Sequence, residues 1–273
     1  MERTPLTLSP EKVVVELQAL LGSHDPKSVV MAFDGDGTLW SGDVGEDLFR
    51  AAMREQYVLE DAREALLAEA ERYQIPLSGH QHANAIAGVL MAAYLAGKYP
   101  ERETCAMMTW CYAGRTLAEV DALARSVLDE EDLESRLTPE LEPIVEFGRS
   151  AGIRLVLVSA SPRAVVEAAG EAWGFAPADI AAATPAVAAG RVLPKMDGPV
   201  PYAADKLSAG RALFGNARWL AAFGDNVFDI DMLTTAEMGV AIRPKPRLAS
   251  ELSALGLRQL EPGLLGASRP TAR

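Results

Sequence analysis

A continuous apolar run, Ser28–Phe33, ends abruptly at the segment DGDGT at residues 34–38. An apolar run with β-branched residues and no polar alternation is typical of a strand that is buried on both faces. Strands of this kind occur mainly in parallel sheets whose two faces are covered by helices. The run therefore favours a fold built around a parallel sheet, with two aspartates at the carboxyl end of one strand.

The second half of the chain continues this pattern. Strands are predicted at Arg154–Val158, Trp219–Phe223 and Gly239–Ile242, and a strand-like pair at 180–193 is split by Ala189-Gly190. Helices are predicted at 11–21, 139–150, 162–173, 203–214 and 228–236. Alternating strands and helices indicate an α/β protein with a Rossmann-like, mostly parallel sheet flanked by helices.

The segment from residue 42 to about 138 has a different pattern. Its apolar residues recur at helical spacing, with no convincing strand among them. It holds 18 acidic and 9 basic residues, and so contributes most of the formal net charge of −12. We predict an all-helical, acidic insert at 42–138, with 1–41 and 139–273 forming the α/β core.

Charge and composition argue against several classes of protein. The acidic balance and the lack of a basic cluster disfavour binding to nucleic acid or to an anionic membrane. The N-terminus has no signal-peptide pattern, and no uncharged apolar run approaches the roughly 20 residues that span a bilayer. Cys105 and Cys111 are too few for a disulfide framework. We predict a cytoplasmic protein; its oligomeric state, including a homodimer, stays open.

Three predicted strands end in polar residues. Asp34 and Asp36 follow the first, Ser159 follows the second, and Asp225 follows the strand that ends at Phe223. Ligands of open α/β sheets bind beyond the carboxyl ends of the strands, so these side chains are expected to share one pocket. Carboxylates with room for water suit Mg²⁺. A carboxylate can also attack phosphorus while its neighbour acts as general acid and base.

Four motifs resemble, in order, those of the haloacid dehalogenase superfamily and in particular its phosphoserine phosphatase-like subfamily. They are FDGDGTL at 33–39, LVLVSAS at 155–161, Lys206 in ADKLSAGRAL, and GDNVFDIDML at 224–233. The resemblance implies a phosphoric monoester hydrolase that uses Mg²⁺ and an aspartyl-phosphate intermediate. Its expected substrate is a small-molecule phosphate ester.

The resemblance also implies a role for each motif residue. Asp34 would be the nucleophile, and Asp36 would protonate the leaving oxygen and then activate water. Mg²⁺ would be held by Asp34, the carbonyl oxygen of Asp36, and Asp225. Ser159 and Lys206 would bind the phosphate group.

Supporting roles are implied for the residues around these motifs. Backbone amides near Gly35 and Ala160 would contact the phosphate, and Asp229 would orient Lys206 or a metal-bound water. The chain departs from phosphoserine phosphatases at Ala160-Ser161, where they usually have a pair of glycines.

Lys195 competes with Lys206 for the third motif. We favour Lys206 because it opens a helix that leads directly to the strand ending at Asp225. Asp231 is an extra carboxylate for which capping or solvent exposure is expected.

The insert follows the first motif, where the superfamily carries a helical cap domain that closes over small substrates. Asp43 occupies the position at which phosphoserine phosphatases have a glutamate for the substrate amine, and Glu46 lies one turn further on. Phosphoserine or a phosphorylated amino alcohol is therefore the favoured substrate. Candidates for an arginine that binds a substrate carboxylate are Arg50, Arg54 and Arg115.

Four aromatic residues have two interpretations: Trp40, Tyr57, Trp110 and Tyr112. They could line a pocket for a cationic substrate through cation–π attraction. They could instead fill the core of the insert, the interpretation that we favour because aromatic side chains are mostly buried.

Two other functions remain as alternatives. A phosphotransferase of the same superfamily would pass the phosphoryl group to an alcohol instead of water. A non-catalytic phosphate-binding regulatory module would store it, but an acid–base residue such as Asp36 beside the acyl-phosphate argues against storage.

Overall fold

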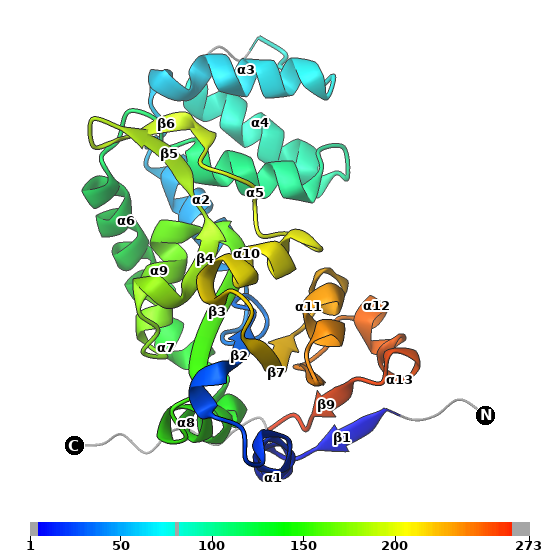
Figure 1. Ribbon diagram of the computed structural model, residues 1–273. Coiled ribbons are helices and arrows are strands. Elements are labelled where there is room, and N and C mark those ends of the chain that lie inside the picture. Colours follow the sequence, from blue (N-terminus) through cyan, green and yellow to red (C-terminus); the bar gives the residue numbers. More distant parts are fainter. Residues whose placement is uncertain (1–4, 80–81, 264–273) are drawn as a thin grey trace.

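The computed structural model describes residues 5–79 and 82–263. Its centre is a seven-stranded sheet with the order β1-β9-β8-β7-β2-β3-β4, in which all neighbouring strands are parallel (Figure 1). The strands are β1 (Leu6–Leu8), β2 (Val29–Phe33), β3 (Arg154–Pro162), β4 (Ile180–Ala183), β7 (Arg218–Gly224), β8 (Met238–Ala241) and β9 (Arg258–Leu260). The predicted α/β fold with a mostly parallel sheet is therefore confirmed.

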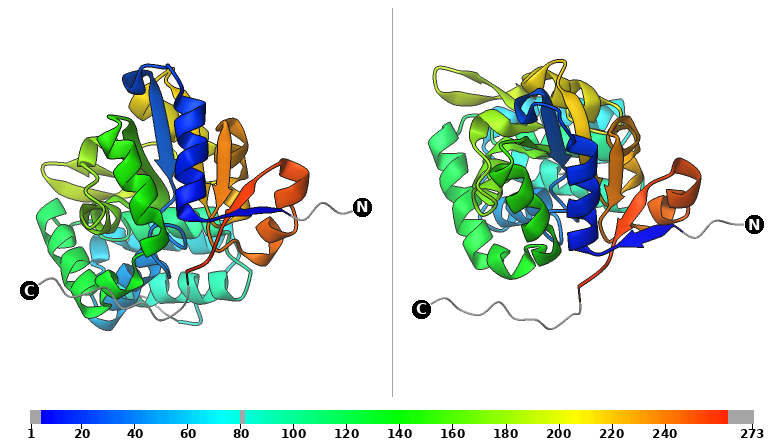
Figure 2. Two further views of the ribbon diagram at one scale, coloured as in Figure 1. Left: turned by 90° about the horizontal axis from the view of Figure 1, so that it is seen from below. Right: turned by 60° about the horizontal axis from the view of Figure 1, so that its bottom comes forward.

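Helices lie on both faces of the sheet (Figure 2). They are α1 (Pro10–Leu21), α8 (Glu142–Ser150), α9 (Arg163–Glu171), α10 (Asp205–Phe214), α11 (Ile230–Thr235), α12 (Pro246–Ala249) and α13 (Leu252–Leu255). Successive residues of β2 alternate between two buried clusters. Met31 and Phe33 belong to the cluster that contains side chains of α1, α8 and α9, whereas Val30 and Ala32 belong to the one that contains α11, α12 and α13. This two-sided burial explains why β2 is apolar at every position.

Between β2 and α8, the described residues form helices and no strand. The helices are α2 (Val44–Arg54), α3 (Arg63–Arg72), α4 (Ala83–Leu95), α5 (Glu101–Trp110), α6 (Leu117–Glu130) and α7 (Leu133–Arg136). The two connections to the sheet run side by side, because Ser41 N donates to Arg136 O (2.9 Å) and Thr138 N donates to Leu39 O (3.0 Å). The insert therefore leaves and rejoins the sheet region at one place, with α3 and α4 furthest from β1 (Figure 1).

The strand pair predicted at 180–193 is divided between two sheets. Residues 180–183 join the main sheet as β4, and a separate antiparallel hairpin is formed by β5 (Pro185–Ala188) and β6 (Arg191–Met196). Ala189 and Gly190 form its turn with φ of 50° and 74°, a pair of positive values that suits a tight hairpin. β6 bonds to the insert, since Gly114 N donates to Val192 O (3.0 Å).

Short elements complete the described chain. Single 3₁₀ turns occur at Pro26–Ser28, Glu60–Ala62, Pro139–Leu141, Pro177–Asp179 and Val227–Asp229. The edge strand β1 and its neighbour β9 escaped prediction because three residues carry too little periodic pattern. Within the described ranges, none of the helices combines the length and apolar character needed to cross a membrane.

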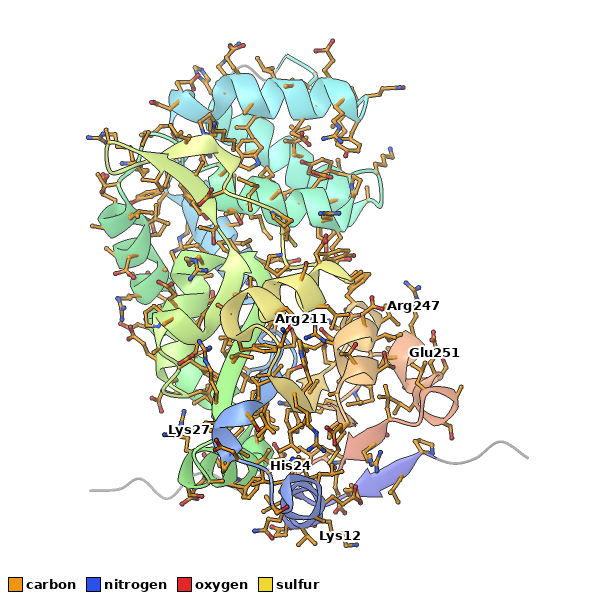
Figure 3. The ribbon with its side chains drawn as sticks, viewed as in Figure 1. Lys12, His24, Lys27, Arg211, Arg247 and Glu251 are labelled. Atoms are coloured by element: carbon orange, nitrogen blue, oxygen red, sulfur yellow. The ribbon has the colours of Figure 1, made fainter. Side chains whose placement is uncertain are left out.

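Exposed basic side chains are found on the half of the molecule that contains the sheet. Figure 3 shows Lys12, Lys27, Arg211 and Arg247 on four different elements there. The insert, in contrast, carries most of the acidic excess. Charge is thus distributed unevenly between the two parts of the chain.

Candidate active site

Asp34 lies at the carboxyl end of β2, where two strands hold it. Its backbone N–H donates to the carbonyl oxygen of Phe223 on the neighbouring β7 (2.9 Å). Its buried carboxylate accepts hydrogen bonds from Lys206 Nζ at Oδ1 (2.6 Å) and from Thr38 Oγ1 at Oδ2 (3.2 Å). The sheet therefore presents this carboxylate in one fixed orientation.

Gly37 allows the loop after β2 to approach Asp225. Its φ is +84°, a conformation that side chains disfavour, and a Cβ there would overlap the Asp225 carboxylate. Gly37, the second glycine of the first motif, thus allows the loop after β2 to lie against the end of β7.

Lys206, in the first turn of α10, is buried between two carboxylates. Its Nζ is 2.6 Å from Asp34 Oδ1 and 2.5 Å from Asp229 Oδ1. Burial opposes the charged ammonium, but Asp229 and Asp34 together raise the pKa of Lys206 above its usual value. The lysine is therefore cationic at neutral pH, and its ammonium lies between the carboxylates of Asp229 and Asp34.

Asp34, Asp225 and Asp229 form a buried acidic triad whose carboxylate oxygens lie within 4.8 Å of one another. Burial and the neighbouring Asp229 raise the pKa of Asp34 well above its usual range, against the opposing effect of Lys206. Burial also raises the pKa of Asp225 to about 6. Such a cluster has excess negative charge, and hard carboxylate oxygens fit Mg²⁺. The residues present therefore suit a divalent cation.

The carboxylate of Asp36 is not part of this triad and bonds to other groups. Oδ1 accepts hydrogen bonds from Trp40 Nε1 and Val44 N, each 2.8 Å away, and Oδ2 accepts one from Ser161 Oγ (2.6 Å). Asp36 is therefore placed for a different task from the three carboxylates of the triad. Its predicted contribution to a metal site was its backbone carbonyl oxygen, not this carboxylate.

Ser159 and Ala160 lie in β3, which continues to Pro162 rather than ending at residue 158. The buried Ser159 hydroxyl accepts a hydrogen bond from Ser161 N (3.1 Å). Both residues line a cavity of about 80 Å³ that is also lined by Asp34, Asp36 and Lys206. The residues of all four sequence motifs thus meet in one cavity.

Comparison with known proteins identifies the family. Residues 31–234 match the family described as haloacid dehalogenase-like hydrolase. The chain belongs to this family. No curated protein sequence matches it.

Solved structures share the fold of this hydrolase at low identity. A protein of unknown function from Bordetella pertussis Tohama I is 21% identical, with a TM-score of 0.63 over 85% of this chain and 98% of that one. A probable phosphoserine phosphatase from Vibrio cholerae is 15% identical, with a TM-score of 0.52 over 89% and 63%. Cytosolic 5'-nucleotidase IIIB bound to cytidine is 12% identical, with a TM-score of 0.54 over 94% and 86%. The predicted likeness to the phosphoserine phosphatase fold is confirmed.

The insert of this haloacid dehalogenase-like hydrolase brings one of the two predicted specificity residues into the cavity. Asp43 lines it and caps α2, accepting a hydrogen bond from Glu46 N (2.8 Å). Burial and the nearby Asp36 raise the pKa of Asp43 to about 8. Glu46 instead lines an adjoining cavity and lies 3.8 Å from Arg50.

Several residues of the cavity were missed by sequence reasoning. Lys245 Nζ lies 3.0 Å from Asp225 Oδ2, and the others are Glu101, Cys105, Tyr202, Asn226 and Phe228. Lys245 comes shortly after β8, so the rule that strand ends carry ligands could have found it. Glu101 and Cys105 lie on α5, and no local pattern distinguishes them from other residues of an acidic helix.

Most other candidates lie away from this cavity. Trp110 and Tyr112 are buried in the core, in agreement with the favoured interpretation. Trp40 is also buried, but it precedes the insert and donates to Asp36 Oδ1 beside the cavity (2.8 Å). Tyr57 packs under Arg115, whose guanidinium carbon lies 4.0 Å from the ring centre. Arg54 pairs with Glu130 (2.9 Å), and Arg50 bonds to Asp47 at the adjoining cavity. Lys195 and Asp231 are exposed.

Proposed function

We propose that this hydrolase is a Mg²⁺-dependent phosphatase that cleaves a small-molecule phosphate monoester through an aspartyl-phosphate intermediate. The observation that carries the proposal is the buried Asp34 carboxylate, held 2.6 Å from Lys206 Nζ in a cavity that Ser159 also lines. A carboxylate beside an ammonium and a hydroxyl is arranged to attack a phosphorus atom whose oxygens those two groups bind.

The reaction takes two steps. First, an Asp34 oxygen bonds to phosphorus, the ester bond between phosphorus and the leaving oxygen breaks, and Asp36 gives that oxygen a proton. Second, Asp36 takes a proton from water as the water oxygen attacks phosphorus, and the bond to Asp34 breaks, releasing inorganic phosphate. Lys206 and the Ser159 hydroxyl donate hydrogen bonds to the phosphoryl oxygens in both steps.

The metal site that we propose consists of Asp34, Asp225 and the carbonyl oxygen of Asp36. The raised pKa of Asp34, caused by burial and by Asp229, supports a cation at this place. When bound, Mg²⁺ would neutralise charge on the transferring phosphoryl group. Asp229 is already bonded to Lys206 and to the amides of Asp225 and Asn226, which favours an orienting role over metal binding.

We also propose that residues 42–138 form a cap domain over a catalytic core made of 1–41 and 139–273. The support is the composition of the cavity wall, since Asp43, Glu101 and Cys105 from the insert lie across from the core residues. A wall supplied by the insert would exclude water from the cavity and recognise the leaving group of the substrate.

We expect phosphate release from a panel of phosphomonoesters to require Mg²⁺, because the triad carries uncompensated charge without it. A colorimetric phosphate assay would measure release with Mg²⁺, after chelation, and after Mg²⁺ is restored. The panel holds phosphoserine, phosphoethanolamine, phosphocholine, sugar phosphates, nucleotides and 4-nitrophenyl phosphate. Folded, Mg²⁺-binding protein that releases phosphate from none of them contradicts the proposal. Transfer to an added alcohol instead of water would identify a phosphotransferase.

Phosphoserine or a phosphorylated amino alcohol is the substrate class that we favour. Glu101 and Asp43 place carboxyl groups on the wall of the insert, and the rings of Tyr202 and Phe228, with centres 4.5 Å apart, pack beside each other on the same cavity. Acidic groups and aromatic faces together attract an ammonium group.

Glu101→Gln tests this substrate class. It should lower the ratio of kcat/KM for phosphoethanolamine to kcat/KM for glycerol phosphate by about tenfold. A loss of this size is expected when one hydrogen bond to a charged group is removed. Glu71→Gln, an exposed position on α3, provides the matched control and should leave the ratio unchanged. If this ratio of kcat/KM values is unchanged in Glu101→Gln, Glu101 does not recognise the ammonium group of the substrate.

A further inference from the structure

The Asp36 carboxylate is held by donors from three parts of the chain. Oδ1 accepts two hydrogen bonds, from Trp40 Nε1 and Val44 N, and Oδ2 accepts one from Ser161 Oγ. Trp40 is fully buried and Val44 begins α2, so packing fixes both donors to Oδ1. A carboxylate oxygen has two lone pairs. Both lone pairs of Oδ1 are therefore engaged, whereas Oδ2 keeps one beside its bond to Ser161.

We propose that Ser161 is a positioning residue for acid–base catalysis by Asp36, an inference that rests on the proposed phosphatase function. Because Oδ1 has no lone pair left, the proton that Asp36 exchanges is carried by Oδ2. The Ser161 hydroxyl occupies one side of Oδ2 and so determines the side on which the proton sits. In the first step this proton goes from Oδ2 to the leaving oxygen as the phosphorus–oxygen bond breaks.

The surroundings of Ser161 hold its hydroxyl in place. Its backbone N–H donates to Ser159 Oγ (3.1 Å), and the residue is only 5% exposed. A Cβ at Gly45 of α2 would lie 2.9 Å from Ser161 Oγ, so the first turn of that helix packs directly on the hydroxyl. One residue thus joins the phosphate-binding end of β3, the acid–base carboxylate and the insert. A glycine at this position, as phosphoserine phosphatases usually have, could not make the bond to Asp36.

The leaving group offers a way to separate this role from a structural one. An alkoxide is a strong base and needs a proton as it departs, whereas 4-nitrophenolate departs without one. The ratio kcat/KM reports only the steps through formation of the aspartyl-phosphate. Losing the hydrogen bond to Asp36 should therefore reduce kcat/KM for alkyl esters and spare the nitrophenyl ester. Damage to folding would affect both esters alike.

The experiment compares wild type, Ser161→Ala and Ser161→Thr, with Mg²⁺, on the alkyl phosphate of the panel that wild type cleaves fastest and on 4-nitrophenyl phosphate. We expect Ser161→Ala to lower kcat/KM about tenfold for the alkyl ester and less than about twofold for the nitrophenyl ester. Ser161→Thr, which keeps a hydroxyl, should restore the alkyl rate. Ser150→Ala, at an exposed hydroxyl on α8, is the control and should change neither.

Two results would overturn the inference, and they differ from failure of the proposed function. If Ser161→Ala lowers kcat/KM equally for both esters, Ser161 supports only the fold. If it lowers kcat/KM for neither ester, acid–base catalysis by Asp36 does not depend on Ser161. Wild-type protein that cleaves neither ester would instead overturn the phosphatase function itself, and the inference with it.

Discussion

Asp34→Asn is expected to lower phosphate release by about 10⁴-fold or more, the order of loss when an enzyme loses its nucleophile. An amide has nearly the shape of a carboxylate but cannot form an acyl-phosphate. Lys206 keeps Asp229 as its partner in this variant, so the site should stay assembled. The rate of phosphate release at saturating substrate and Mg²⁺ measures the effect.

The covalent intermediate can be tested in the same variant. Wild-type protein that is quenched with acid during turnover of an ester with a radiolabelled phosphate group should carry the label. Asp34→Asn should carry none. Asp231→Asn is the matched control, because it makes the same chemical change at an exposed position of α11. Substantial turnover by Asp34→Asn would show that another group attacks phosphorus.

Lys206→Met is expected to lower the free energy of unfolding by about 3–5 kcal/mol in the absence of Mg²⁺, the cost of breaking a buried ion pair. The substitution removes the ammonium that lies between Asp34 and Asp229, and it leaves two buried carboxylates without that partner. Urea unfolding followed by tryptophan fluorescence measures the change. The loss of unfolding free energy should be smaller in mildly acidic than in mildly alkaline buffer. A buried carboxyl without a cationic partner takes up a proton more readily than a paired one, and the neutral form is less costly to bury.

Lys195→Met is the control for this prediction. It removes the same charge from an exposed position on β6 and should change stability by no more than about 0.5 kcal/mol. Phosphate release should be lost with Lys206→Met and kept with Lys195→Met. Equal stability of the two variants would contradict the role of Lys206 as the buried counter-ion of the site.

Local patterns were sufficient for the strands that carry the site. β2, β3 and β7 are buried on both faces, so each appears in the sequence as a continuous apolar run followed by polar residues. β5 and β6 were recognised as a pair but not as a separate hairpin, because alternation along a segment does not show which neighbour it bonds to. The three-residue strands β1 and β9 offered too few residues for any pattern.

The cavity wall supplied by the insert was largely beyond sequence reasoning. Asp43 was found through the resemblance to phosphoserine phosphatases, which have a glutamate at this position after the first motif. Glu101 and Cys105 lie on α5, whose sequence pattern shows only a helix. The aromatic residues that looked suited to a pocket are mostly buried in the core. The sequence could not show this, because it tells that a side chain is apolar but not which surface it faces.

The sequence by itself determined the kind of sheet, the order of the motifs and the strands that carry Asp34, Ser159 and Asp225. These follow from periodicity within single segments and from the rule that parallel strands end at one edge. Only the tertiary structure decided that Lys206 rather than Lys195 meets Asp34, and that the Asp36 carboxylate bonds to Ser161. Those contacts join residues more than a hundred positions apart, so they depend on how several elements pack together, which no local pattern records.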